Sequence, residues 1–226
     1  MVKSLTLLIV LIGLSMTALS EPKPYKATYD VYEDGTVKAI LTSRLKKTGA
    51  NQFQLTDLTE GTAGLASLLN FKRIEQTDFI FHNNLPEAIY HSMHQKVAFK
   101  SNHYEFKHQP GETGYQGIDH KKPFQLNSQQ PLFSNQLMSW QLAQQVCQDP
   151  KNNMQWPVLN AQQAKLYFFK ISAVDNNRSL VHRQYQNRSD KSTAIWINTQ
   201  ECYIEEIIYQ KDQKVVRTVL KNIVFE

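Results

Sequence analysis

Hydrophobic and polar residues alternate along most of the chain, which is the pattern of half-buried β-strands. In the segment 25–32 every second residue is apolar or aromatic, so these residues would share one face of a strand. The alternation returns at 37–45 and 52–59, and the turn at 33–36 contains Asp-Gly, a strong hairpin signal. The sequence therefore predicts an antiparallel meander from its first strand.

The C-terminal part has the same character. Segments 192–198, 202–210 and 215–225 are rich in β-branched and aromatic residues, and the polar breaks between them are short enough for hairpin loops. Between the two meanders, further strands are expected at 73–81, 86–95, 96–101, 104–108, 152–159, 164–174 and 179–186. The segment 109–130, with two prolines and three glycines, is predicted to be a long loop.

One segment, 132–148, has the period of a helix instead. Pro131 suits a first helical turn, and Asp149-Pro150 would stop the helix. A helix this apolar must pack against the sheet. Its apolar residues recur at steps of three and four: Phe133, Leu137, Trp140, Ala143 and Cys147.

The segment 61–71 breaks the strand pattern, because it is rich in glycine and other small residues. Its Leu65, Leu68 and Leu69 have the spacing of one or two helical turns. Two interpretations are open. The segment could be a corner that plugs one end of the core, or an apolar lip over a ligand cavity.

Residues 1–20 have the features of a signal peptide, with a short basic start, an apolar run and small residues near Ser20. We expect cleavage after Ser20, which leaves residues 21–226 as a single β-rich domain exported to the periplasm. The alternative is an uncleaved anchor, but the apolar run is shorter than a spanning helix requires. No later segment is apolar enough to span a membrane.

The two cysteines, Cys147 and Cys202, are an even pair. In an oxidising compartment such a pair is most simply a disulfide, whereas in the cytosol it would be two buried thiols. With no histidine nearby at ligand spacing, the pair does not predict a metal site.

Charge and motifs exclude several functions. The formal net charge of +5 is spread among acidic residues, which argues against a nucleic-acid partner. His91 and His94 would point to opposite faces of a strand, so we expect no metal. No catalytic or phosphate-binding motif occurs, and Glu205 and Glu206 would also face opposite ways, so neither an enzyme nor a cofactor is indicated.

A series of short motifs runs through the chain: Tyr25-Lys-Ala-Thr-Tyr29, Gly61 to Leu68, Glu75 to Phe79, Pro86 to Tyr90, Pro131 to Leu137, Val158 to Asn160 and Thr193 to Ile197. These motifs and the order of elements resemble a family of exported bacterial proteins described only as a domain of unknown function. The chain departs from the pattern of this family between the last hairpins, where it has Cys202-Tyr203-Ile204 in place of an expected proline. The resemblance implies a curved antiparallel sheet, a half-barrel or open barrel meander with the helix on its concave face. Such sheets are similar to the half-barrels of periplasmic lipoprotein carriers, which implies an apolar ligand.

The leading hypothesis is therefore a periplasmic binding or carrier protein for an apolar or lipid-like ligand. The second is an envelope protein with a filled core that binds a protein partner through its sheet edge or the segment 109–130, and the third is an envelope enzyme. The candidate ligand-lining residues are Leu65, Leu68, Phe71, Phe99, Trp140 and Phe168.

Overall fold

The computed structural model describes residues 22–82, 85–175 and 177–226. The predicted signal peptide, residues 1–20, lies outside the described residues. The helices are α1 (Gly64–Leu68) and α2 (Asn135–Gln148). The strands are β1 (Tyr25–Glu33), β2 (Thr36–Gly49), β3 (Gln52–Gly61), β4 (Lys72–His82), β5 (Leu85–Val97), β6 (Lys100–His108), β7 (Gly114–Asp119), β8 (Lys122–Asn127), β9 (Asn153–Asn160), β10 (Gln163–Asp175), β11 (Arg178–Gln184), β12 (Lys191–Asn198), β13 (Tyr203–Lys211) and β14 (Lys214–Phe225).

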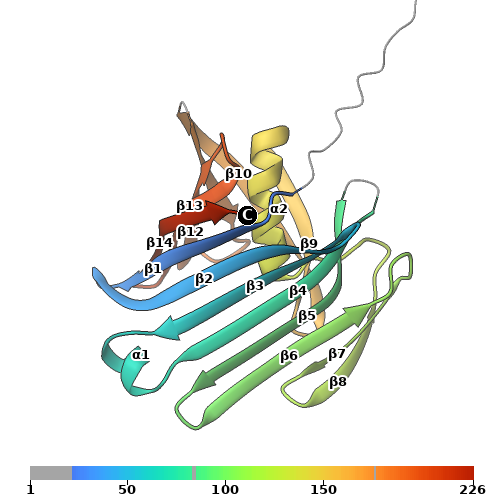
Figure 1. Cartoon of the computed structure of the whole chain (residues 1–226), viewed down its shortest axis with the longest axis horizontal. Coiled ribbons are helices and arrows are strands. Elements are labelled where there is room, and N and C mark those ends of the chain that lie inside the picture. The colour runs from blue at the N-terminus through green and yellow to red at the C-terminus, as the bar shows by residue number, and fades with distance from the viewer. Residues whose placement is uncertain (1–21, 83–84, 176) are drawn as a thin grey trace, which may run out of the picture.

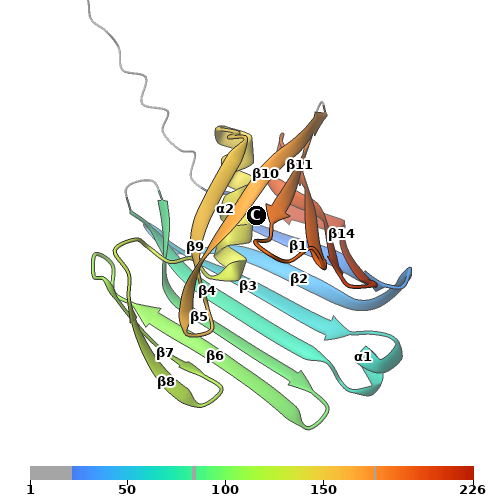
Figure 2. The same cartoon turned by 180° about the vertical axis from the view of Figure 1, so that it is seen from behind.

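All strands belong to one 14-stranded antiparallel sheet. Its order is β8-β7-β6-β5-β4-β3-β2-β1-β14-β13-β12-β11-β10-β9, so the N-terminal and C-terminal meanders join where β1 pairs with β14. The sheet curls around α2, which lies between the wall formed by β1 to β8 and the wall formed by β9 to β14 (Figure 1 and Figure 2). The predicted fold class, a curved antiparallel sheet with an apolar helix on its concave face, is confirmed.

Helix α2 supplies the centre of the core. Leu137 and Leu142 are fully buried, and Trp140 packs against Phe79 and Phe81 with ring centroids 5.5 Å and 6.2 Å away. The inner faces of both walls add aromatic and aliphatic side chains to the same cluster. None of the helices in the described part of the chain has the length and apolar character needed to cross a membrane.

The predicted start of α2 was wrong by three residues. Helix α2 begins at Asn135, and Ser134 is its N-cap, with its side chain accepting a hydrogen bond from the Leu137 amide at 3.0 Å. Before the helix the chain is extended, because Phe133 forms a parallel bridge with Val158 of β9. This bridge pairs part of the outer side of β9, which is an edge strand of the sheet.

The prediction of a long loop at 109–130 was wrong, because this segment contains the hairpin β7–β8. Its turn residues, His120 and Lys121, have positive φ angles of 47° and 71°, a conformation usually marked by Asn-Gly. Gly117 is required by packing, since a Cβ atom there would lie 2.2 Å from the Glu105 carbonyl oxygen and 2.5 Å from the Phe124 ring.

A second correction concerns the strands predicted at 86–95, 96–101 and 104–108. The structure has two strands here, β5 and β6, and the chain turns at Ala98, whose φ is 52°, and Phe99. The polar residues Asn102 and His103 are paired inside β6.

The short helix α1 forms at the predicted corner but does not plug the core. Leu65 and Leu68 are 73% and 77% exposed. The Leu69 carbonyl accepts a hydrogen bond from the Ala98 amide at 2.6 Å, which ties the corner to the β5–β6 turn. The corner therefore projects from the end of the sheet.

Candidate ligand-binding cleft

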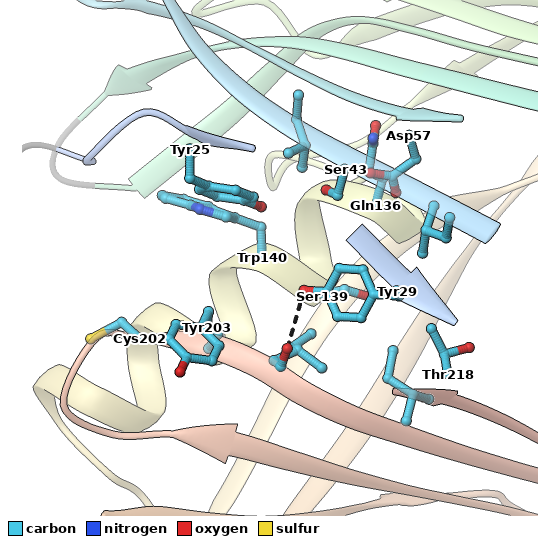
Figure 3. Close-up of a pocket in the computed structure, with 15 residues that line it drawn as sticks. Tyr25, Tyr29, Ser43, Asp57, Gln136, Ser139, Trp140, Cys202, Tyr203 and Thr218 are labelled. Carbon is cyan, nitrogen blue, oxygen red and sulfur yellow. Dashed lines mark hydrogen bonds between the residues drawn. The ribbon is translucent and has the colours of Figure 1, made fainter. Parts of the chain in front are cut away.

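A cleft of about 130 Å³ lies between α2 and the strands around the β1–β14 junction (Figure 3). A second cavity of about 150 Å³ adjoins it, and Tyr25, Trp140, Cys202 and Tyr203 line both cavities. Most of the first cavity is apolar, and its aliphatic lining consists of Leu41, Leu55, Ala143, Ile204 and Ile207.

Aromatic side chains from three elements form the sides of the cleft. Trp140 comes from α2, Tyr25 and Tyr29 from β1, and Tyr203 from β13. The Tyr29 hydroxyl donates a hydrogen bond to the Ile204 carbonyl at 3.1 Å, which links the two walls (Figure 3). Burial, together with the nearby Asp57 carboxylate, raises the pKa of Tyr25 and Tyr29 well above the ordinary tyrosine value. Both tyrosines are therefore neutral side chains that offer ring surface.

A polar group stands at one end of this apolar cleft. Asp57 of β3 lies directly opposite Ser43 of β2 and Glu75 of β4. Gln136 of α2 faces them, and Figure 3 shows Ser43, Asp57 and Gln136 grouped together. We call Ser43, Asp57 and Gln136 the polar floor.

The pKa of Asp57 is raised to about 6, chiefly by burial and in part by the neighbouring Glu75 carboxylate. Ser43, Gln136 and the more distant guanidinium of Arg73 act in the opposite direction. Arg73 forms an ion pair with Glu75. Asp57 is therefore a carboxyl group whose charge is only partly compensated by protein groups.

Two atoms of the polar floor are buried and form no hydrogen bond of good geometry in the described part of the chain, although the Gln136 amide lies close enough to Asp57 to lower the pKa of this carboxyl. They are Oδ1 of Asp57, an acceptor, and Nε2 of Gln136, a donor. The Gln136 side chain is held in place, because its Oε1 accepts a hydrogen bond of 2.9 Å from the Thr77 hydroxyl. Gln136 is only 6% exposed, so an unsatisfied amide donor here is costly.

Thr77 is itself fixed by a buried network. Its Oγ1 lies 2.9 Å from His91 Nδ1 and 2.9 Å from the Ser134 hydroxyl. The Thr77 hydroxyl donates its single proton to Gln136. The Ser134 hydroxyl and the His91 ring must therefore both donate to Thr77. The pKa of His91 is lowered to about 4, chiefly by burial and in part by the Arg73 charge, so the ring is neutral near pH 7. The network leaves Nε2 of Gln136 directed away from Thr77.

A second polar cluster lies outside the cleft. Glu87 accepts hydrogen bonds from His108 at 2.7 Å and from His82 at 3.3 Å, and the His108 ring stacks on Tyr115. The side chains of His108 and Glu87 are both buried, at 1% and 4% exposed.

The structure brings only one of the sequence-predicted ligand-lining residues into the cleft. Trp140 lines it, whereas Leu65, Leu68 and Phe99 are exposed at the α1 corner and the β5–β6 turn. Leu68 and Phe99 share a shallow depression on that surface. Phe71 and Phe168 are half-buried and line neither cavity of the cleft.

Sequence reasoning missed the polar floor, although a signal exists. Asp57 follows Phe53 and Leu55 at steps of two, so its carboxyl must share their buried face. Ser43 stands between Leu41 and Leu45 in the same way. A charged residue at an inward position of a strand is rare without a partner and could have marked the site.

The two cysteines lie side by side at the outer end of the cleft, and both are free thiols in the structure. The thiol of Cys147 interacts with Cys202, which raises the pKa of Cys147 and lowers that of Cys202. The Cys147 thiol also donates to the Asn198 carbonyl at 3.5 Å. Their proximity agrees with the predicted pairing, but the disulfide itself stays a prediction. Within residues 22–82, 85–175 and 177–226, no group of three or more metal-binding side chains occurs.

No protein-family model matches this chain, and none of the curated proteins matches it. Its fold is similar to the crystal structure of a beta-barrel-like protein of domain of unknown function DUF1849 from Brucella abortus. The TM-score is 0.58 and the sequence identity 9%, over 90% of this chain and 98% of that chain. The similarity supports the resemblance to a domain of unknown function with a barrel-like fold. At this identity it shows the fold alone.

Proposed function

We propose that this protein is a periplasmic binding or carrier protein, which holds an apolar or lipid-like group in the cleft between α2 and the sheet. The observation that carries the proposal is the cleft itself. It is lined mainly by aromatic and aliphatic side chains, and it ends in a few polar groups that could orient a ligand. Small-molecule sites have this composition. Export rests on the signal-peptide pattern of residues 1–20.

The volume of the cleft limits what it can hold. A cavity of roughly 150 Å³ is enough for a molecule the size of benzene. The two adjoining cavities, about 130 Å³ and 150 Å³, therefore suit a ring or part of a hydrocarbon chain rather than a whole diacyl lipid. A carrier with this cleft would hold one apolar group of its cargo and leave the remainder outside.

The proposal can be tested with a neutral fluorescent ligand, N-phenylnaphthylamine, whose emission rises in apolar surroundings. Ala143 on α2 lines the cleft, so Ala143→Leu would fill it. We expect the wild type to bind the dye and Ala143→Leu to bind it at least about tenfold more weakly, since the added atoms occupy the ligand's space. Ala164→Leu, at an exposed position of β10, is the matched control and should bind like the wild type.

Equal binding by wild type and Ala143→Leu, with circular dichroism showing both folded, would place the dye elsewhere and contradict the proposal. Absence of binding would favour the second candidate function, an envelope protein that binds a protein partner. The supporting observation for that candidate is the group of exposed apolar side chains at the α1 corner, namely Leu65, Leu68 and Phe99.

A further inference from the structure

From the polar floor we infer the chemical class of the ligand: an apolar molecule that carries a hydroxyl group, which donates to Asp57 and accepts from Gln136. This inference rests on the proposed function, because it concerns the same cleft. It starts from two buried atoms without a well-formed hydrogen bond, one acceptor and one donor, on two side chains that line the cleft.

A hydroxyl oxygen can satisfy both atoms at once. Its proton can go to Oδ1 of Asp57 and its lone pair can accept from Nε2 of Gln136. The bond to the carboxylate would be charge-assisted and therefore stronger than a bond between neutral groups. Oε1 of Gln136 is already engaged by Thr77 at 2.9 Å, so the amide offers only its donor to the cleft.

Other polar groups fit less well. A carboxylate would stand beside Asp57, which already faces Glu75 across the β3–β4 pair. An ammonium group would satisfy Asp57 but has no acceptor for the Gln136 amide, which would stay buried and unpaired. An ether or a plain hydrocarbon could not donate to Asp57 at all. Of the groups compared, only the hydroxyl leaves neither atom unsatisfied.

The remaining lining agrees with a hydroxyl on an apolar body. Tyr29 uses its own hydroxyl on the Ile204 carbonyl, and Ser139 donates to the Asn135 carbonyl within α2. These two polar groups are therefore occupied, and beyond the floor the walls offer mainly Trp140, Tyr25 and aliphatic side chains. One polar contact at the end of an apolar cleft would set both the orientation and the selectivity of binding.

Four ligands of matched chain length test the inference by displacement of N-phenylnaphthylamine: octanol, octyl methyl ether, octylamine and octanoate. We expect the wild type to bind octanol roughly tenfold or more tightly than the ether, because the ether leaves Asp57 unpaired. Octylamine and octanoate should bind more weakly than octanol. Tighter binding of the amine or the acid would overturn the assignment of a hydroxyl.

Variants then locate the contact. Asp57→Asn keeps the size of the side chain but removes its charge, so octanol should bind roughly fivefold more weakly while ether binding stays unchanged. Gln136→Met removes the donor and should also reduce the preference for octanol over the ether. Gln125→Met, at an exposed position of β8 that lines neither cavity of the cleft, is the matched control and should keep the wild-type preference.

The outcomes separate the inference from the proposed function. Equal affinity for octanol and the ether in the wild type would overturn the hydroxyl assignment while the binding function stands. The hydroxyl assignment is also overturned if Asp57→Asn and Gln136→Met, both folded by circular dichroism, keep the wild-type preference for octanol over the ether. If neither the dye nor any of the four ligands binds, the proposed function itself fails.

Discussion

The carboxyl of Asp57 ties the stability of the protein to pH. Its pKa is raised from 3.8 to about 6, so the folded state binds this proton more tightly than the unfolded state does. The stability that depends on Asp57 is therefore highest below about pH 4 and declines as pH rises to about 6, by about 3 kcal/mol. An acid held in an ion pair has a lowered pKa, and its contribution to stability is lost as pH falls rather than as pH rises.

His91 acts in the reverse direction over nearly the same range. Its pKa is lowered from 6.5 to about 4, so the unfolded state takes up the proton first as pH falls. The stability that depends on His91 increases as pH rises from about 4 to about 6.5, by roughly 3 kcal/mol. In the wild type the contributions of Asp57 and His91 largely cancel.

Asp57→Asn should remove the pH-dependent contribution of Asp57 to stability and leave that of His91. We expect the variant to match the wild type in stability near pH 4 and to exceed it by about 3 kcal/mol near pH 7, since no buried charge remains to desolvate. Urea unfolding followed across this range checks the prediction. Asp34→Asn, in the exposed turn between β1 and β2, is the control and should keep the wild-type profile. A uniform shift of stability at every pH in Asp57→Asn would contradict the assigned titration.

At the scale of the elements, the sheet follows from alternation, since the strands with regular apolar and polar positions were predicted close to their observed ranges. Turns that lack a standard sequence signature were not predicted. The β7–β8 turn places His120 and Lys121 at positive φ, the geometry of a two-residue hairpin turn, without the Asn-Gly that usually marks such a turn. Helix α2 was found from its period, but its first residue depends on Ser134 as the cap.

The candidate site was less predictable, for a physical reason. Ser43, Asp57 and Gln136 meet only because β2 and β3 pair in one register and α2 packs onto them. The β2–β3 register follows from the hairpin turn and the apolar pattern, but the packing of α2 onto these strands is a long-range property that no local pattern contains. The inward position of Asp57 on β3 could be predicted from the sequence, whereas the packing of Gln136 against it could not.

Gly117 should be indispensable for the edge hairpin. A Cβ atom at this position would meet the Glu105 backbone and the Phe124 ring, so Gly117→Ala must displace β8 from the sheet. We expect a loss of roughly 1–3 kcal/mol in stability and faster amide exchange confined to β7 and β8. In Gly114→Ala the nearest atom would lie 3.9 Å from the new Cβ, so this variant should behave like the wild type. Similar exchange in both variants would be inconsistent with the packing described.

At the scale of the whole molecule, two cysteine thiols lie side by side where the end of α2 meets the start of β13. In an oxidising compartment we predict that Cys147 and Cys202 form a disulfide, because their thiols already interact. Closing a loop of about 55 residues should stabilise the fold by about 4 kcal/mol. Intact-mass analysis of periplasmic protein should show the loss of two hydrogens, and dithiothreitol should lower Tm in the wild type but not in Cys147→Ser. A full complement of alkylatable thiols in the unreduced protein would refute the pairing.

The whole fold can be understood as a sheet that curls around one helix and leaves space where α2 meets the junction of the two meanders (Figure 1). The curl follows from the twist of a long antiparallel sheet and from the need to bury the apolar faces of both walls. The space beside Trp140 remains because Ala143 and Ser139 are small. The proposed binding function therefore depends on the space where α2 meets the junction of the two meanders.

The most direct test of this account is native mass spectrometry of the protein purified from the periplasm, before and after solvent extraction. We predict an adduct on the wild type and on Ala164→Leu that extraction removes, and that is absent from folded Ala143→Leu. The extracted molecule should carry a hydroxyl on an apolar body. A wild-type protein without any adduct, which also fails to bind added octanol, would contradict the claim that the α2 cleft holds a ligand.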